Sequence, residues 1–191
     1  MNSGIGLNGF VESKQKREPS KEDGIYYYEG FKTALWVKAL VPSKKKRLAI
    51  FLKVASLLGE MVSVKLESRR FTGREFFRHG ITIAQLGRVL NQHLPLVSHD
   101  PELTITVGEL FSVVGEPSVI LNQNKAIVIF SSDWKDPDTY KRFIDAIEPL
   151  GLLWGYDSKF RQRFIDRRFP ESACSRFYDD VLVLIKDLET I

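Results

Sequence analysis

The middle of the chain narrows the choice of fold most, because it holds a series of short segments rich in β-branched residues. The segments span residues 103–107, 110–114, 118–121 and 125–130. They are separated by turn-forming residues, namely Gly108, Gly115-Glu116-Pro117 and Asn122-Gln123-Asn124. This spacing is typical of an antiparallel meander. The last segment, KAIVIF, is apolar at both parities after Lys125, so we expect it to lie centrally and to be covered on both faces.

Helical patterns flank this region. Ser43 is suited to cap a helix, and the residues after it repeat at helical spacing on one apolar face, namely Leu48, Phe51, Leu52, Ala55 and Leu58. Thr72 with Glu75, and Thr82 with Gln85, have the spacing of capping boxes. The sequence therefore predicts helices at 44–58, 73–79, 83–94, 137–148, 158–169 and 172–189. Strands are expected at 34–40, 62–66 and 152–155.

This order of elements predicts an α+β fold, with one mainly antiparallel sheet and helices packed on it. We expect residues 25–191 to form a single domain. Residues 1–24 have no periodic apolar positions and are expected to form a flexible arm. No apolar run approaches the roughly 18 residues of a membrane span, so we expect a cytoplasmic protein with no membrane partner.

The stretch GIGLNG, residues 4–9, matches the G-x-G-x-x-G spacing of dinucleotide-binding loops. Such a loop follows a buried strand and opens a helix whose N–H groups meet the pyrophosphate. Only three residues precede Gly4, and no helical pattern follows Gly9. We therefore expect no nucleotide cofactor at this stretch, and nothing else in the sequence indicates one.

Few residues are suited to catalysis or to metal binding. The three histidines, at positions 79, 93 and 99, lack the i, i+4 spacing that places two imidazoles on one metal ion. Cys174 is the single cysteine, and we expect it to be a partly buried thiol without a disulfide. Neither a metal site nor an enzyme is expected from these residues.

One pattern favours an alternative, a metal-dependent nuclease. Pro137-Asp138 with Asp157-Ser158-Lys159 is similar to the PD...(D/E)xK pattern, in which two acids hold a metal ion and a lysine helps to activate water. Asp138 falls in the first turn of an expected helix, where a carboxylate stabilises the helix N-terminus. We favour this structural role for Asp138.

Basic residues concentrate in the first half of the chain. Residues 1–91 hold 17 Lys+Arg against 8 Asp+Glu, whereas residues 92–191 hold 11 against 16. Cations at the start of an expected helix oppose the helix dipole at a cost of about 0.3–1 kcal/mol each, which indicates an anionic partner. One function left open is therefore nucleic-acid binding, by a patch of Lys44, Lys45, Lys46, Arg47, Arg69 and Arg70. Arg74 and Arg78 would extend this patch.

Acidic residues and one tryptophan gather at the ends of the expected meander strands. A loop tryptophan among acids is suited to a protein interface, and an acidic surface complements a basic partner. We expect a protein partner to contact Glu109, Glu116, Asp133, Trp134, Asp136 and Asp138.

The stretches PELTITVGELFSVVGEPSVILNQ and DPDTYKRFIDAIEPLGLLWG resemble the second half of polymorphic-toxin immunity proteins. The resemblance is to the α+β family paired with restriction-endonuclease-like toxins, and it includes the glycine of TVGEL, here Gly108. It implies a non-enzymatic cytoplasmic inhibitor that binds one toxin tightly. The sequence therefore favours an inhibitor of this type, with the nucleic-acid-binding module as the alternative.

Overall fold

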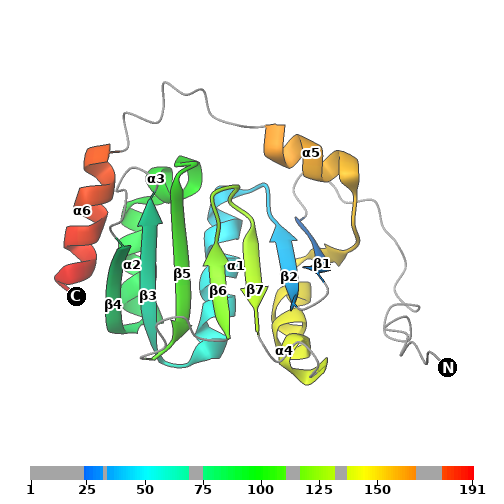
Figure 1. The fold of residues 1–191 in the computed structure, drawn as a ribbon, viewed down its shortest axis with the longest axis horizontal. Coiled ribbons are helices and arrows are strands. Elements are labelled where there is room, and N and C mark those ends of the chain that lie inside the picture. The colour runs from blue at the N-terminus through cyan, green and yellow to red at the C-terminus, as the bar shows by residue number, and fades with distance from the viewer. Residues whose placement is uncertain (1–23, 32–33, 69–74, 111–116, 132–136, 167–177) are drawn as a thin grey trace.

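The computed structural model describes residues 24–31, 34–68, 75–110, 117–131, 137–166 and 178–191 (Figure 1). Its strands are β1 (Gly24–Phe31), β2 (Ala34–Leu40), β3 (Met61–Ser68), β4 (Glu75–Thr82), β5 (Leu103–Glu109), β6 (Ser118–Leu121), β7 (Ile127–Phe130) and β8 (Leu152–Trp154). Its helices are α1 (Lys44–Ala55), α2 (Ile83–Gln92), α3 (Leu94–His99), α4 (Pro137–Ile147), α5 (Ser158–Asp166) and α6 (Tyr178–Glu189). Two 3₁₀ turns are η2 (Ser56–Leu58) and η3 (Glu148–Leu150). Within these ranges no helix is long and apolar enough to cross a membrane.

All eight strands belong to one sheet, in the order β4-β3-β5-β6-β7-β2-β1-β8. The strands β5, β6 and β7 form the predicted meander at its centre. The hairpins β3–β4 and β1–β2 flank it on either side (Figure 1). Every neighbouring pair is antiparallel except β1 with β8. The prediction of one α+β domain with a mainly antiparallel sheet is confirmed.

The strand register defines two ends of the sheet. The upper end in Figure 1 contains Leu40, Ser68, Leu103, Leu121 and Ile127. The lower end contains Trp36, Glu109, Ser118 and Phe130. Because β2 runs towards the upper end, α1 begins there.

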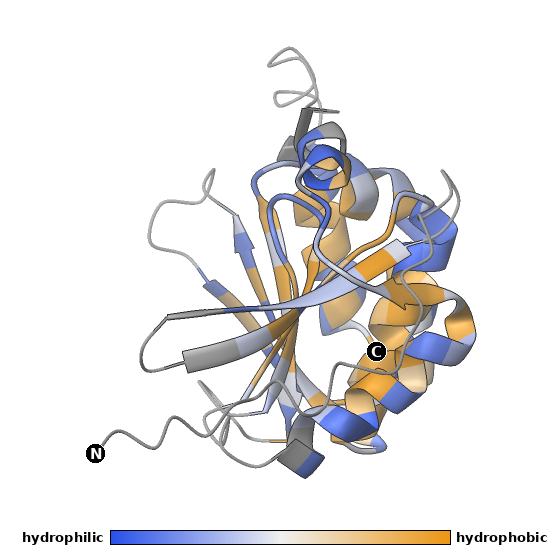
Figure 2. Cartoon of the chain, turned by 90° about the vertical axis from the view of Figure 1, so that its right-hand side faces the viewer, coloured by the Kyte–Doolittle hydropathy of each residue, from blue (hydrophilic) through white to orange (hydrophobic). Residues whose placement is uncertain are grey.

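Helices cover one face of the sheet, and Figure 2 shows apolar residues concentrated where these helices meet the strands. Val62, Val64 and Leu66 alternate towards this face as predicted, and all three are buried. The helix α5 packs elsewhere, because its Phe160 joins a smaller apolar cluster at the β1–β2 corner of the opposite face. That cluster contains Ile25, Tyr27, Leu40 and Ala126.

The strand β7 is central, as predicted from KAIVIF, but its two faces differ. Ile127 and Ile129 are buried on the helix-covered side, whereas Val128 and Phe130 are only half-buried on the other side. The expectation of full cover on both faces is wrong, because the helices that pack on this part of the sheet all lie on one side. Lys125 belongs to the preceding turn and has a φ of 60°.

The helix expected at 73–79 is wrong, because Glu75–Thr82 is the strand β4. Pairing with β3 supplies this segment with ladder hydrogen bonds, and this long-range pairing outweighs the local capping signal. The register shifts between Val62 and Val64, so that Ser63 faces both His79 and Gly80. Gly80 has a φ of 73°, which suits a bulge at this point.

The predicted capping box at Thr82 and Gln85 is confirmed, with both of its hydrogen bonds present. The helix that follows ends at Gln92 instead of continuing to residue 94, and α3 begins immediately after it. Pro95 lies in the first turn of α3, where its missing N–H costs least. A proline cannot continue a helix, so Pro95 explains why the single helix expected at 83–94 is divided into α2 and α3.

Some of the remaining predictions can be compared with the structure, and others fall on residues that it does not describe. The helices α1 and α4 and the short strand β8 lie where they were expected. Gly108, expected in a turn, instead belongs to β5, where it pairs with Ser63 and Ser118. The strand β1, which the sequence analysis did not predict, begins at Gly24, one residue before the expected start of the domain. Outside the described residues lie the arm over 1–23, most of the strand expected at 110–114, the start of the helix expected at 172, and Cys174.

We predict that Phe51→Ala lowers the free energy of unfolding by about 3–5 kcal/mol, because Phe51 is fully buried between α1 and the sheet. Urea denaturation gives the measurement. Leu182→Ala on α6 is the control, since Leu182 is 45% exposed and its loss should change stability by about 0.5 kcal/mol or less. Equal losses in the two variants would contradict this packing of α1.

Candidate anion-binding site at the start of α1

Four cationic residues, Lys44 to Arg47, form the first turn of α1. Ser43 caps this turn, because its Oγ accepts a hydrogen bond from the Lys46 N–H at 3.4 Å. The Arg47 N–H donates to the Ser43 carbonyl at 2.8 Å. No acid lies in the first turn. The partial positive charge of the helix N-terminus is therefore increased by its own side chains.

These four side chains take different directions. Lys44 Nζ is in hydrogen-bonding contact with Nε2 of His99 at the end of α3. Lys46 extends towards Gly151, where its Nζ lies 3.3 Å from the position of an added Cβ. Lys45 is exposed, and Arg47 turns inward and is only 8% exposed. Of the four, Lys44 and Arg47 are therefore the residues that contact side chains of other segments.

The Arg47 guanidinium lies at the helix start, where Nη2 donates to the Pro42 carbonyl at 3.2 Å. It also lies over the Phe164 ring of α5, 5.7 Å from the ring centroid. Nε is buried without a hydrogen-bond partner, and within the described part of the chain no carboxylate pairs with this guanidinium. Burial lowers the pKa of Arg47 to about 10, so the group stays charged at neutral pH. A buried cation without a carboxylate is costly, and an anion would offset that cost.

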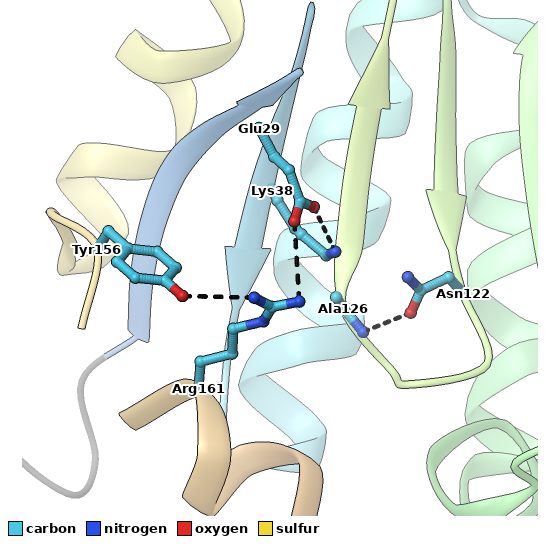
Figure 3. A network of polar contacts seen from close by, with 6 residues as sticks. All are labelled: Glu29, Lys38, Asn122, Ala126, Tyr156 and Arg161. Atoms are coloured by element: carbon cyan, nitrogen blue, oxygen red, sulfur yellow. Dashed lines mark hydrogen bonds and ion pairs between the residues drawn. The ribbon is translucent and has the colours of Figure 1, made fainter. Parts of the chain in front are cut away.

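Lys125 reaches the same region from the turn between β6 and β7. This turn is held by Asn122, whose Oδ1 accepts from the Ala126 N–H at 2.9 Å (Figure 3). The Asn122 carbonyl also accepts from the Lys125 N–H at 2.8 Å. The Lys125 side chain is buried, and its Nζ donates to the Leu103 carbonyl at 2.9 Å. A second buried cation therefore lies at the upper end of the sheet.

The charges of three cations from separate segments act on His99. Its pKa is lowered first by burial, and then by the positive charges of Lys44, Arg47 and Lys125. We call these four residues, Lys44, Arg47, His99 and Lys125, the upper basic cluster. The neighbouring acid is Asp100, which is fully buried and accepts a hydrogen bond from the Glu102 N–H at 2.9 Å. The cluster draws its members from α1, α3 and the β6–β7 turn.

The helix α5, which carries Phe164, is tied to the sheet by a polar network. Glu29 of β1 bonds Lys38 of β2 at 2.6 Å, and its other oxygen lies 3.8 Å from Arg161 of α5 (Figure 3). Arg161 also donates to the Tyr156 hydroxyl at 3.3 Å. This network helps to fix the ring that lies against the Arg47 guanidinium.

The predicted basic patch is therefore brought together in part. Lys44, Lys45, Lys46 and Arg47 share the upper end of the sheet, whereas Arg69 and Arg70 lie outside the described residues, as does Arg74. The strand β3 that precedes them ends at Ser68, which pairs with Leu103 at this same end. Arg78 does not extend the patch, because it donates to the Ile191 carbonyl at 2.6 Å beside β4.

Sequence reasoning missed His99 and Lys125. Neither lies near Lys44 in the sequence, and only the sheet topology brings them to the start of α1. The one local signal was the Asn122-Gln123-Asn124 turn, which places Lys125 at the end of a hairpin.

Of the predicted acidic contacts, Glu109 lies at the opposite end of the sheet, where it pairs with Val62. Glu109 and Asp138 are exposed, whereas Glu116, Asp133, Trp134 and Asp136 lie outside the described residues. The strands that border these segments all meet at the lower end, because Ser118 pairs with both Gly108 and Phe130. Glu109 is therefore separated from the basic first turn of α1 by the length of the strands.

The acids of the nuclease-like pattern lie at helix starts. Asp138 is in the first turn of α4, and Asp157 caps α5 by accepting from the N–H groups of Lys159 and Phe160 at 2.8 and 3.0 Å. Over the described ranges, no three side chains suited to metal binding come together. These positions favour structural roles for both acids.

No protein-family model matches this chain, and neither a curated protein nor a solved structure matches it. The resemblance to immunity proteins thus stays a prediction.

We predict that His99 makes the protein less stable as the pH falls. Its folded pKa lies below the ordinary value of 6.5, so the unfolded chain takes up the proton first, and stability is lost as the pH falls through 6.5. In His99→Gln, the drop in unfolding free energy between about pH 7.5 and about pH 5.5 should be smaller than in the unmodified protein. Urea titrations at both pH values test this, and identical drops would show that His99 titrates normally.

Proposed function

We propose that the protein binds the phosphate groups of nucleic acid through the upper basic cluster. The observation that carries this proposal is the gathering of cations from three separate segments around one helix N-terminus. Arg47 and Lys125 are both buried there, at 8% and 5% exposure. A helix N-terminus with converging donors is suited to phosphate oxygens.

The energetics support an anionic ligand. Arg47 has a buried Nε without an acceptor, and the described residues supply no carboxylate to its guanidinium. A stability-driven sequence would have an apolar side chain or a paired acid at such a position. Retaining an uncompensated cation is consistent with a ligand that brings the negative charge.

The surroundings of the cluster favour a polyanion over a small acid. Lys45 is exposed beside it on the same helix turn, and Lys44 is exposed at its rim. A chain of phosphates can contact the buried centre and these exposed lysines together. The affinity should then depend strongly on salt.

We predict that labelled DNA or RNA binds with an affinity that falls steeply with salt, measured by fluorescence anisotropy. For three phosphate contacts, raising the salt fourfold should weaken binding roughly 40-fold. The double variant Lys44→Glu/Lys45→Glu should lose binding at low salt. Lys53→Glu/Lys186→Glu is the control, because it makes the same change in net charge at exposed positions away from the cluster. Equal loss in both variants, or no binding by the unmodified protein, would refute the proposal.

A second candidate function is the inhibitor suggested by the immunity-protein resemblance. The observation that favours it is the register that brings the ends of β5, β6 and β7 to the lower end. Glu109 and Asp138 are exposed near the segments that carry the other predicted acids. An acidic surface there would complement a basic toxin.

We predict that Glu109→Lys/Asp138→Lys weakens capture of this toxin at least tenfold and leaves nucleic-acid binding unchanged. Affinity capture from nuclease-treated extract, followed by titration of the captured protein, gives the measurement. Asp145→Lys/Glu189→Lys, at two exposed acids of α4 and α6, is the matched control. Unchanged affinity in the first variant would remove the lower end as the inhibitory surface.

A further inference from the structure

We propose that the open face of the sheet, the side away from α1, α2, α4 and α6, binds the open face of a second copy of this chain. The proposal concerns a surface other than the upper basic cluster and is independent of nucleic-acid binding. Three observations carry it, namely the apolar centre of the open face, the order of side chains along its central row, and the charges of two ion-pair networks. Together they indicate a weak two-fold dimer.

The centre of the open face is apolar. Side chains alternate along β6 and β7, so Ile120, Val128 and Phe130 point away from the helix-covered core. All three are only half-buried. An antiparallel sheet that faces water usually carries polar side chains on that side. Partly exposed apolar side chains on adjacent central strands therefore indicate a protein partner.

One row of cross-strand neighbours crosses the open face from β4 to β1, and each of its members pairs with the next. The row consists of Phe77, Lys65, Thr106, Ile120, Val128, Lys38 and Tyr27. On either side of Ile120 there follow a β-branched residue, a lysine and an aromatic residue. A two-fold axis that passes by Ile120, parallel to the strands, would place Ile120 against its own copy and Thr106 against Val128 of the second copy. The interface would then be isologous.

Exposed aromatic rings lie at both ends of this row. Phe77 is 37% exposed at the β4 end. At the β1 end, the buried Tyr27 packs edge-on against Tyr156, with 5.2 Å between the ring centroids, and Tyr156 is 58% exposed. The same two-fold axis brings the β4 end of one copy over the β1 end of the other. Phe77 and Tyr156 would then bury each other, and aromatic residues contribute strongly to interfaces.

The ion-pair networks at the two ends of the row have opposite net charges. Their members are Lys65, Glu67 and Glu75 on β3 and β4, and Glu29, Lys38 and Arg161 on β1, β2 and α5. One cation with two carboxylates gives −1 in the first network, and two cations with one carboxylate give +1 in the second. An axis parallel to the strands places the first network opposite the second. An axis across the strands would place each network opposite its own copy, where like charges repel.

The size of the open face indicates a weak association. Strands lie about 4.8 Å apart, so the row is about 30 Å wide, and strands of this length give about 20 Å in the other direction. The helix α5 occupies the β1–β2 corner of this area through Phe160. The two copies would therefore bury roughly 1,000 Å² in total, which lies at the lower limit of specific interfaces. We expect a dissociation constant in the micromolar range.

Sedimentation equilibrium of the full chain, without nucleic acid, should show a monomer–dimer equilibrium across the micromolar range. Ile120→Asp should weaken association at least tenfold, because it places two carboxylates together at the axis. Val183→Asp is the matched control, since Val183 is 48% exposed on α6 and lies away from the open face. Thermal unfolding shows whether each variant is folded. If Ile120→Asp does not fold, Ile120→Thr provides a milder change at the same position.

Cross-linking tests the direction of the axis. Packed sheets lie about 10 Å apart, too far for a direct disulfide between facing side chains, so a short bismaleimide is used. The variants are made in a Cys174→Ser background, which removes the single native cysteine. Thr106→Cys mixed with a differently tagged Val128→Cys should give cross-linked dimers with one copy of each. Thr106→Cys alone should give far fewer.

Each contrary outcome overturns a defined part of the proposal. A monomer at every concentration would overturn the dimer. A dimer that Ile120→Asp and Val183→Asp leave equally intact would show that the open face is not the interface. Cross-linking of Thr106→Cys to itself in preference to Val128→Cys would overturn the axis parallel to the strands, and with it the pairing of the two ion-pair networks.

Discussion

Burial of one face of the sheet determines where the described helices other than α5 lie. The strands alternate so that β3, β5, β6 and β7 all turn apolar side chains to the same side, and α1, α2, α4 and α6 contribute their apolar faces to this core. A shift of one residue in any strand would turn its apolar side chains to the open face, so the register is strongly fixed. With α1 held by Phe51 under the sheet, its basic first turn is fixed at the upper end. The position of the candidate site therefore follows from core packing rather than from the cations themselves.

Local periodicity was sufficient for the elements whose signals lie within one short segment. The meander, α1 and α4 were predicted because β-branched runs and helical apolar spacing determine them locally. The helix predicted at 73–79 was wrong for two reasons. The strand β4 depends on pairing with β3, and the spacing of Thr72 and Glu75 indicated a helix cap locally. The break between α2 and α3 was missed although Pro95 marks it, because apolar spacing appeared to continue through it. The error at β4 thus depended on long-range pairing, whereas the error at Pro95 was a local signal that was overlooked.

In the candidate site, too, the features set within one short segment were predicted and those set by distant segments were not. Lys44 to Arg47 are contiguous, so one window of sequence reveals them as a patch. The inward turn of Arg47 and its contact with Phe164 depend on α5, which follows more than a hundred residues later. His99 and Lys125 enter only because α3 and the β6–β7 turn finish at the upper end. The sequence thus shows where the basic residues are dense. It does not show that Arg47 is buried, which is what makes its charge costly.

The Phe164 ring over Arg47 couples two equilibria in this protein. Docking of α5, held by Phe160 and the Arg161–Glu29 ion pair, removes Arg47 from water and so raises the free energy of its charged form. Any anion that compensates this guanidinium lowers the cost of keeping α5 docked. By reciprocity, a firmly docked α5 raises the affinity for that anion by the same factor. The helix that covers a corner of the open face is therefore thermodynamically linked to the occupancy of the upper basic cluster.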